Sequence, residues 1–264
     1  MTELTLGFSP CPNDTFIFHA LLHKRIDTGA YSFSTQIEDV EALNLAAFER
    51  RLQVTKLSSG AWLRLKDKYE LLDSGAAMGF GCGPLVVTAA GHKLGAASRI
   101  AVPGLYTTAL LLMKSWNPAL KNLSEERFDR ILPGIRSGKY DAGLVIHEGR
   151  FIYQDYGCVK AADLGEWWEE ETGCPIPLGC LAIRKDPETF AHRENMERLI
   201  RESVLCARAH PAESRAFIRS HAPGASDKII DAHINLYVND YSVSMGETGK
   251  KAFRVLEERC KQNL

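Results

Sequence analysis

The sequence lacks the features that mark several large classes of protein. Its 32 Lys and Arg residues are balanced by 33 Asp and Glu residues, so the formal net charge is -1. No cluster of basic residues suggests a surface for nucleic acid or an anionic membrane. No apolar run reaches the roughly 18 residues that would suggest a membrane span. We therefore expect a globular protein with no nucleic-acid or membrane partner.

The seven cysteines form no metal-binding or disulfide pattern. Their number is odd, and neither a C-x-x-C motif nor a Cys/His ligand spacing occurs along the chain. No two histidines have metal-binding spacing either, so the sequence predicts no metal site. Most of the cysteines have apolar neighbours, which predicts small buried side chains in a reducing compartment. They are Cys11, Cys82, Cys158, Cys174, Cys180, Cys206 and Cys260.

Two further signatures of enzyme classes are absent or incomplete. No Gly-x-Ser-x-Gly nucleophile elbow occurs, and no cysteine has an evident base partner. The segment 79–83 (GFGCG) is followed by Pro84 and a strand pattern rather than a helix, and its spacing is not G-x-G-x-x-G. We interpret it as a hinge or a close approach of two backbones, not as a phosphate-binding loop.

The chain does contain short apolar strand patterns that alternate with helical patterns, which is typical of an α/β fold with a largely parallel sheet. The strand patterns cover residues 4–8, 31–38, 53–57, 85–89, 99–102, 128–131 and 142–146. The helical patterns cover residues 15–23, 40–48, 60–67 and 108–114. Beyond Pro187 the periodicity becomes that of amphipathic helices, over residues 196–207, 214–219, 227–237 and 252–260.

The helix-rich C-terminal part needs a sheet to cover, and the best candidate is the N-terminal sheet. We therefore predict a discontinuous larger α/β domain of residues 1–89 and 181–264 and a smaller α/β domain of residues 90–180. The crossings are expected near the Gly-rich segment 79–84 and near a turn at 175–179. Two crossings make a hinge, and hinged domains close around ligands.

Three of the strand patterns end in similar turns that lead into a helix. The turns contain residues 13–14 (Asn-Asp), Ser58 and residues 107–108 (Thr-Thr), which are of the types that cap helix N-termini. In open α/β sheets such turns lie where ligands bind, and helix N-termini attract anions. One interpretation is a carboxylate site to which Lys56 adds a full charge. The alternative, for each turn taken singly, is plain helix capping.

The strand pattern 142–146 ends abruptly in His147. This histidine either hydrogen-bonds locally at the strand end or acts as a general base at the mouth of a cleft, and the stretch alone favours the local role. A second histidine, His233, lies at helical spacing from Ile230 and Tyr237. That spacing predicts a core histidine whose hydrogen bonds are satisfied.

Taken in order, these motifs resemble those of one family, the 1,4-dihydroxy-6-naphthoate synthases of the futalosine pathway of menaquinone biosynthesis. The resemblance covers nearly the whole chain, and the strings SPCPNDTF and IHE-x-RF are its most specific parts. The matching segments are 8–16 (FSPCPNDTF), 39–44 (DVEALN), 55–58 (TKLS), 83–87 (GPLVV), 102–109 (VPGLYTTA), 142–151 (AGLVIHEGRF) and 163–169 (DLGEWWE).

The resemblance implies a two-domain, type II periplasmic-binding-protein-like fold with a cleft between the domains. It also implies a cytoplasmic carbon–carbon lyase that converts cyclic dehypoxanthine futalosine to 1,4-dihydroxy-6-naphthoate without a metal or organic cofactor. The proton acceptor of the family corresponds to His147, which the resemblance therefore predicts as the catalytic base. The substrate contacts of the family correspond to Lys56, Leu57, Ser58, Thr108 and Ala109.

Two alternatives stay open at this stage. A solute-binding protein would share the fold without catalysis. The sequence begins without the basic and apolar regions of a secretory signal peptide, so we expect a cytoplasmic location instead. Chorismate dehydratase, the sister enzyme of the same pathway, also shares the fold, although the segments above fit the naphthoate synthase better. The sequence predicts neither an oligomeric state nor roles for Asn13, Asp14, Glu148 and Arg150.

Overall fold

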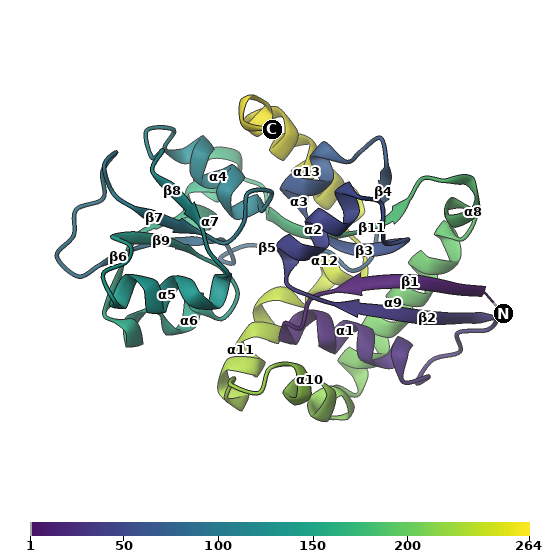
Figure 1. Ribbon diagram of the computed structural model, residues 1–264. Helices are drawn as coiled ribbons and strands as arrows, with labels where there is room; N and C mark the ends of the chain where they lie inside the picture. The colour runs from purple at the N-terminus through teal and green to yellow at the C-terminus, as the bar shows by residue number, and fades with distance from the viewer. Residues whose placement is uncertain (1) are drawn as a thin grey trace.

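The computed structural model describes residues 2–264 and divides them between two lobes, each built on its own β-sheet (Figure 1). One sheet has six strands and the other has five. The chain crosses between the lobes within residues 80–84 and again within residues 173–175. The α/β fold class and the two-lobed arrangement are those expected from the sequence.

The first sheet is formed by β1 (Thr2–Phe8), β2 (Tyr31–Ile37), β3 (Val54–Ser58), β4 (Tyr69–Leu71), β5 (Ala77–Gly79) and β11 (Ile176–Arg184). Its order is β2-β1-β3-β11-β4, and β5 also pairs with β11. The strands β1, β2 and β3 are parallel, whereas β11 is antiparallel to β3, β4 and β5. The sheet is therefore mixed, not largely parallel, because β11 enters it from the other lobe.

The second sheet is formed by β6 (Leu85–Ala89), β7 (Ile100–Val102), β8 (Leu123–Glu125), β9 (Ala142–Val145) and β10 (Cys158–Asp163). Its order is β10-β6-β9-β7-β8. Here β7 is parallel to β8 and β9, and β6 is antiparallel to β9 and β10. The strand β9 lies in the middle of this sheet, so the residue that follows it emerges from a buried position.

The helices distribute between the lobes as Figure 1 shows. The first lobe carries α1 (Pro12–Leu22), α2 (Val40–Phe48), α3 (Ser59–Arg64), α8 (Pro187–Phe190), α9 (Arg193–Ala209), α10 (Arg215–His221), α11 (Asp227–Tyr237), α12 (Asp240–Val243) and α13 (Gly246–Cys260). The second carries α4 (Thr108–Trp116), α5 (Phe128–Arg136), α6 (Gly149–Ile152) and α7 (Leu164–Thr172). Short 3-10 turns cover Tyr153–Tyr156, Pro211–Ser214 and Lys261–Asn263.

The amphipathic pattern of the C-terminal part is confirmed by its packing. The apolar residues of α9 are buried in a core cluster shared with β1 and α1, as predicted for helices that cover the N-terminal sheet. The first lobe is thus built from both ends of the chain. None of the helices within residues 2–264 is long and apolar enough to cross a membrane.

Three details of the sequence interpretation are wrong. Residues 128–131 begin helix α5, whose apolar side chains are buried one helical turn apart, despite Pro133 inside the helix. Residues 175–179 are not a turn but the start of β11. The strand β6 pairs with β9 and β10, so the predicted domain boundary at 89–90 falls one strand too late. The sequence of an apolar strand near a domain boundary does not indicate which of the two sheets the strand joins.

Candidate active site

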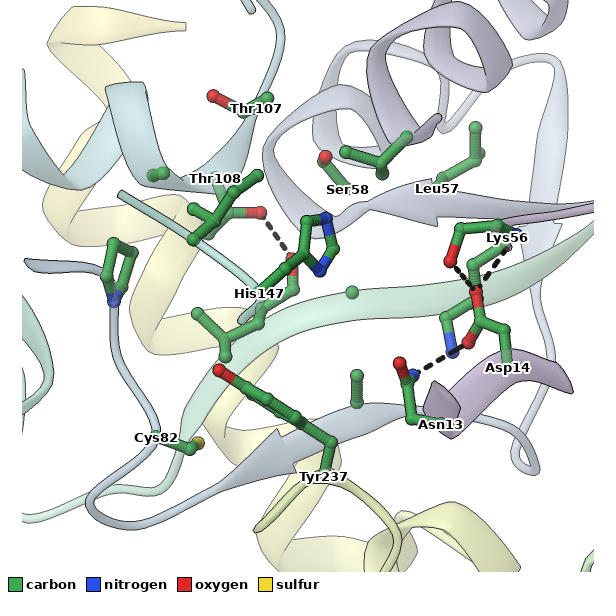
Figure 2. A pocket seen from close by; sticks show the side chains of 18 of the residues that line it. Asn13, Asp14, Lys56, Leu57, Ser58, Cys82, Thr107, Thr108, His147 and Tyr237 are labelled. Carbon is green, nitrogen blue, oxygen red and sulfur yellow. Dashed lines mark hydrogen bonds and ion pairs between the residues drawn. The ribbon is translucent and has the colours of Figure 1, made fainter. Parts of the chain in front are cut away.

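A cavity between the two lobes contains the residues that the sequence singled out (Figure 2). Its cavity volume is about 90 Å³, so the lobes enclose only a small space between them. All six predicted site residues line it: Lys56, Leu57, Ser58, Thr108, Ala109 and His147. The chain also places Asn13, Asp14, Cys82, His233 and Tyr237 in its wall.

The three turns predicted to form a ligand site do converge on this cavity. They lead into α1, α3 and α4, and each contributes residues to the wall. Helix capping explains only the turn before α4. There the Thr107 side chain accepts a hydrogen bond from the Leu110 amide of the same helix. The side chains of Cys11 and Ser58 make no such bond at the starts of α1 and α3.

Lys56 and Asp14 form a buried ion pair at one end of the cavity (Figure 2). The Lys56 Nζ atom lies 2.8 Å from Asp14 Oδ1 and also donates to the Gly75 carbonyl at 2.8 Å. The same carboxylate accepts hydrogen bonds from Ser9 N, Ser9 Oγ and Asn13 Nδ2. The expected full positive charge at Lys56 is therefore neutralised within the protein.

A second buried network holds Ser58 and joins the lobes. The Asn44 amide accepts from Ser58 N at 2.9 Å and donates to Ser58 Oγ at 3.1 Å. It also donates to the carboxylate of Glu41, which accepts from the Tyr106 amide of the other lobe. Burial raises the pKa of Glu41, while its hydrogen bonds with Asn44 and Tyr106 lower it. This network fixes the position of the β3–α3 turn relative to α4.

The N-terminus of α4 presents unbonded amides to the cavity. Its third and fourth N–H groups, those of Leu110 and Leu111, donate to Thr107 Oγ1 and Thr107 O. The amides of Thr108 and Ala109 have no protein acceptor within the described part of the chain. The Thr108 hydroxyl is already engaged, since it accepts from Gly60 N and donates to the Leu178 carbonyl. The groups of this helix that could bind an anion are therefore the backbone N–H groups of Thr108 and Ala109.

His147 occupies the strained turn that follows β9. Its φ is +53°, in the left-handed region that few residues other than glycine adopt, and this turn directs the ring into the cavity. Its Nδ1 atom lies 3.4 Å from Cys11 Sγ. Its Nε2 atom is buried and has no hydrogen-bond partner among residues 2–264. A local strand-end hydrogen bond therefore does not explain this residue.

The protonation state of His147 suits a base. Burial lowers its pKa below the ordinary 6.5, and the nearby carboxylates of Glu148, Asp14 and Asp39 oppose that shift. The ring is therefore neutral near neutral pH, with a nitrogen lone pair available for a proton. The neighbouring Phe128 ring packs edge-on against it, with the ring centroids 5.0 Å apart.

Arg150 braces the turn that carries His147. Its guanidinium donates to the Gly83 carbonyl and, at 2.7 Å, to the buried carboxylate of Asp163. Asp163 also caps α7 by accepting from the Gly165 amide. A Cβ atom on Gly83 would lie 2.2 Å from Gly165 N, so the Gly-rich segment is the close backbone approach predicted from the sequence.

His233 is a site residue that the sequence interpretation missed. It is fully buried, as predicted, but neither of its ring nitrogens has a hydrogen-bond partner in the part of the chain that the structure describes. Its ring stacks on that of His147 with the centroids 6.2 Å apart, and it lines the cavity. Burial lowers the pKa of His233 well below its ordinary value, so the ring is neutral. No pattern in the sequence around His233 indicates that α11 reaches this cavity.

Comparison with known proteins identifies the family of this chain. Residues 4–262 match a family described as Menaquinone biosynthesis. A Thermus thermophilus protein named 1,4-dihydroxy-6-naphtoate synthase is 46% identical over 96% of this chain and 92% of its own length. A Streptomyces coelicolor protein of the same name is 40% identical over 97% and 92% of the two chains. The chain belongs to this family.

Solved structures show how the family fold relates to others. A crystal structure of an Archaeoglobus fulgidus protein shares 37% identity and a TM-score of 0.91 over 99% of this chain and 97% of its own. The alkanesulfonate-binding protein of Xanthomonas axonopodis superposes with a TM-score of 0.66 at 12% identity, covering 90% and 84% of the chains. The naphthoate synthase family therefore has the fold of periplasmic binding proteins, as the resemblance implied.

Proposed function

We propose that this protein converts cyclic dehypoxanthine futalosine to 1,4-dihydroxy-6-naphthoate by a base-initiated carbon–carbon cleavage, as a lyase of menaquinone biosynthesis. Family membership over nearly the whole chain supports an enzyme of that pathway. The observation that carries the chemistry is the neutral ring of His147, whose Nε2 atom lacks a partner among the described residues, at the wall of the cavity.

In this proposal His147 removes a proton from a hydroxyl group or an acidic C–H group of the substrate. Ring opening and scission of a carbon–carbon bond follow, and aromatisation of the naphthoate ring drives the step. A positioned base contributes about 10²–10⁴-fold to the rate of such a reaction. The strained backbone at His147 and the Arg150–Asp163 brace hold the base in place.

The carboxylate of the substrate is anchored by backbone donors in this proposal. The free amides of Thr108 and Ala109 at the start of α4 are the best candidates, because they have hydrogen atoms to donate and the positive end of a helix dipole behind them. Lys56 contributes a remaining N–H group next to Ser58 rather than a net charge, because Asp14 already neutralises it. Leu57 lies in the apolar wall between them.

The test is a single-turnover assay, followed by mass spectrometry, with the purified protein and cyclic dehypoxanthine futalosine. We expect naphthoate from the wild type and a rate lower by about 10²–10⁴-fold for His147→Asn, which removes the base yet tolerates the left-handed backbone. Added imidazole should restore part of the rate to His147→Gly, which opens space for it. Matching thermal unfolding midpoints serve as the control for folding.

Other outcomes distinguish the alternatives. Equal rates from wild type and His147→Asn would keep the enzyme but remove His147 as the base. Binding of the unchanged compound without product would favour a solute-binding protein, the role of several proteins that share the fold. Turnover of chorismate in place of cyclic dehypoxanthine futalosine would favour the chorismate dehydratase activity.

A further inference from the structure

Three side chains with metal-binding atoms meet beside the cavity, although they are far apart in the sequence. His147 and His233 line the cavity, and Cys11 lies next to His147. Cys11 precedes α1, His147 follows β9, and His233 lies on α11. One ligand atom from each lies within 4.8 Å of the other two. No spacing rule along the chain detects such a group, because the three residues come from three separate elements.

The geometry is close to that of a zinc site. Typical Zn–S and Zn–N bond lengths at a tetrahedral angle place the sulfur and nitrogen about 3.5 Å apart. The Cys11 Sγ and His147 Nδ1 atoms are 3.4 Å apart. A modest turn of the His233 ring towards this pair would complete a three-ligand site. The fourth position would face the cavity, because both histidines line it.

The histidine ligands are not committed to other partners. Both nitrogens of the fully buried His233 and the Nε2 atom of His147 are unbonded among the residues described. Burying such groups without hydrogen bonds costs stability, so a ligand that satisfies them is favoured. The donor set of one sulfur and two imidazole nitrogens suits Zn²⁺ rather than Mg²⁺ or Ca²⁺, which prefer oxygen ligands.

The surroundings also suit a cation. The Glu148 carboxylate acts on Cys11 through its negative charge, whereas the charge of Asp14 is balanced by Lys56. Glu148 would offset part of the net positive charge that remains when Zn²⁺ binds one thiolate and two neutral imidazoles.

We propose that Cys11, His147 and His233 bind one Zn²⁺ ion, and that this ion inhibits the enzyme reversibly. On binding, a bond forms from the metal to each of the three side chains, and the Cys11 thiol releases its proton to solvent. The bound metal then takes up the lone pair of one His147 nitrogen and blocks access of the substrate to this ring. The binding site stands on the cluster alone, whereas the inhibition rests on the proposed function of His147.

Binding is tested with Co²⁺ as a spectroscopic substitute for Zn²⁺, on the metal-free full-length protein. We expect one Co²⁺ per chain, with the absorption of a four-coordinate site and a thiolate-to-metal band, and its displacement by Zn²⁺. Calorimetric titration with Zn²⁺ should show at least a tenfold loss of affinity in Cys11→Ala and in His233→Phe. The matched control is Cys82→Ala, which removes another buried cysteine of the cavity and should keep the spectrum.

Activity gives a separate readout. Stoichiometric Zn²⁺ should abolish turnover by the wild type, and a chelator should restore it. The site is refuted if wild type binds no Co²⁺, or if Cys11→Ala and His233→Phe bind Zn²⁺ as tightly as wild type. Full turnover by the zinc-saturated enzyme, or turnover that requires zinc, would refute the inhibition alone. Absence of turnover in every state would count against the proposed function and leave the spectroscopic test intact.

Discussion

Two pairs of buried polar side chains in the same cavity differ in how they are satisfied. Asp14 and Lys56 bond to each other and to neighbouring groups of the first lobe. His147 and His233 stack at 6.2 Å, and three of their four ring nitrogens lack a partner among residues 2–264. A satisfied pair stabilises the fold, whereas an unsatisfied pair costs stability and is retained for what it binds.

The comparison also separates two kinds of site residue. Lys56 is predicted to bind the substrate, yet its Nζ atom is already bonded to Asp14 near the start of α1 and to the Gly75 carbonyl. The two histidines line the cavity, and three of their ring nitrogens are unbonded among residues 2–264. We therefore expect mutations of the first pair to act mainly on stability and mutations of the second pair to act mainly on function.

The largest effect on stability is expected from Lys56→Ala. Removing the lysine leaves Asp14 charged and unpaired in a buried position, which costs about 3–5 kcal/mol of unfolding free energy. Chemical denaturation measures this change. The control is Lys66→Ala, which breaks an exposed pair with Glu257 and should cost at most about 1 kcal/mol. Equal losses in the two variants would show that Asp14 is not held by Lys56.

A smaller effect of the opposite sign is expected from His233→Phe. The substitution keeps a ring but removes two buried nitrogens without partners in the described chain, so unfolding free energy should rise by about 1–3 kcal/mol. The control is His192→Phe, which loses the hydrogen bond between His192 Nδ1 and Tyr31 Oη and should be destabilised. A loss of stability in His233→Phe would mean that these nitrogens are satisfied.

The smallest effect is expected on the pH dependence of Glu148→Gln. In the proposed mechanism turnover requires neutral His147, so kcat/KM should fall as pH drops through the pKa of that residue, which burial places below 6.5. The Glu148 carboxylate raises this pKa, and its removal should move the acid limb to lower pH. Glu247→Gln, at an exposed position on α13, is the control and should leave the limb unchanged. A shift of the acid limb to higher pH in Glu148→Gln would contradict the assignment of this limb to His147.

Much of the local structure could be predicted because its causes are local. Val40–Phe48 is helical as predicted, since Asp39 caps it and its apolar residues have helical spacing. Residues 128–131 are predicted as a strand but form the first turn of α5 (Phe128–Arg136), because four residues are too few to show helical periodicity. The helix tolerates Gly134 because Tyr140 packs where a Cβ atom would lie.

By itself the sequence determined the α/β class, the family and six of the residues that line the cavity, because these depend on periodicity, capping residues and motif strings. Tertiary structure alone decided the rest. It joined β6 to the second sheet, paired Lys56 with Asp14 and brought His233 beside Cys11 and His147. These contacts link residues more than 40 positions apart, and pairing at that distance is set by how sheets and helices close around a shared core, not by any pattern along the chain.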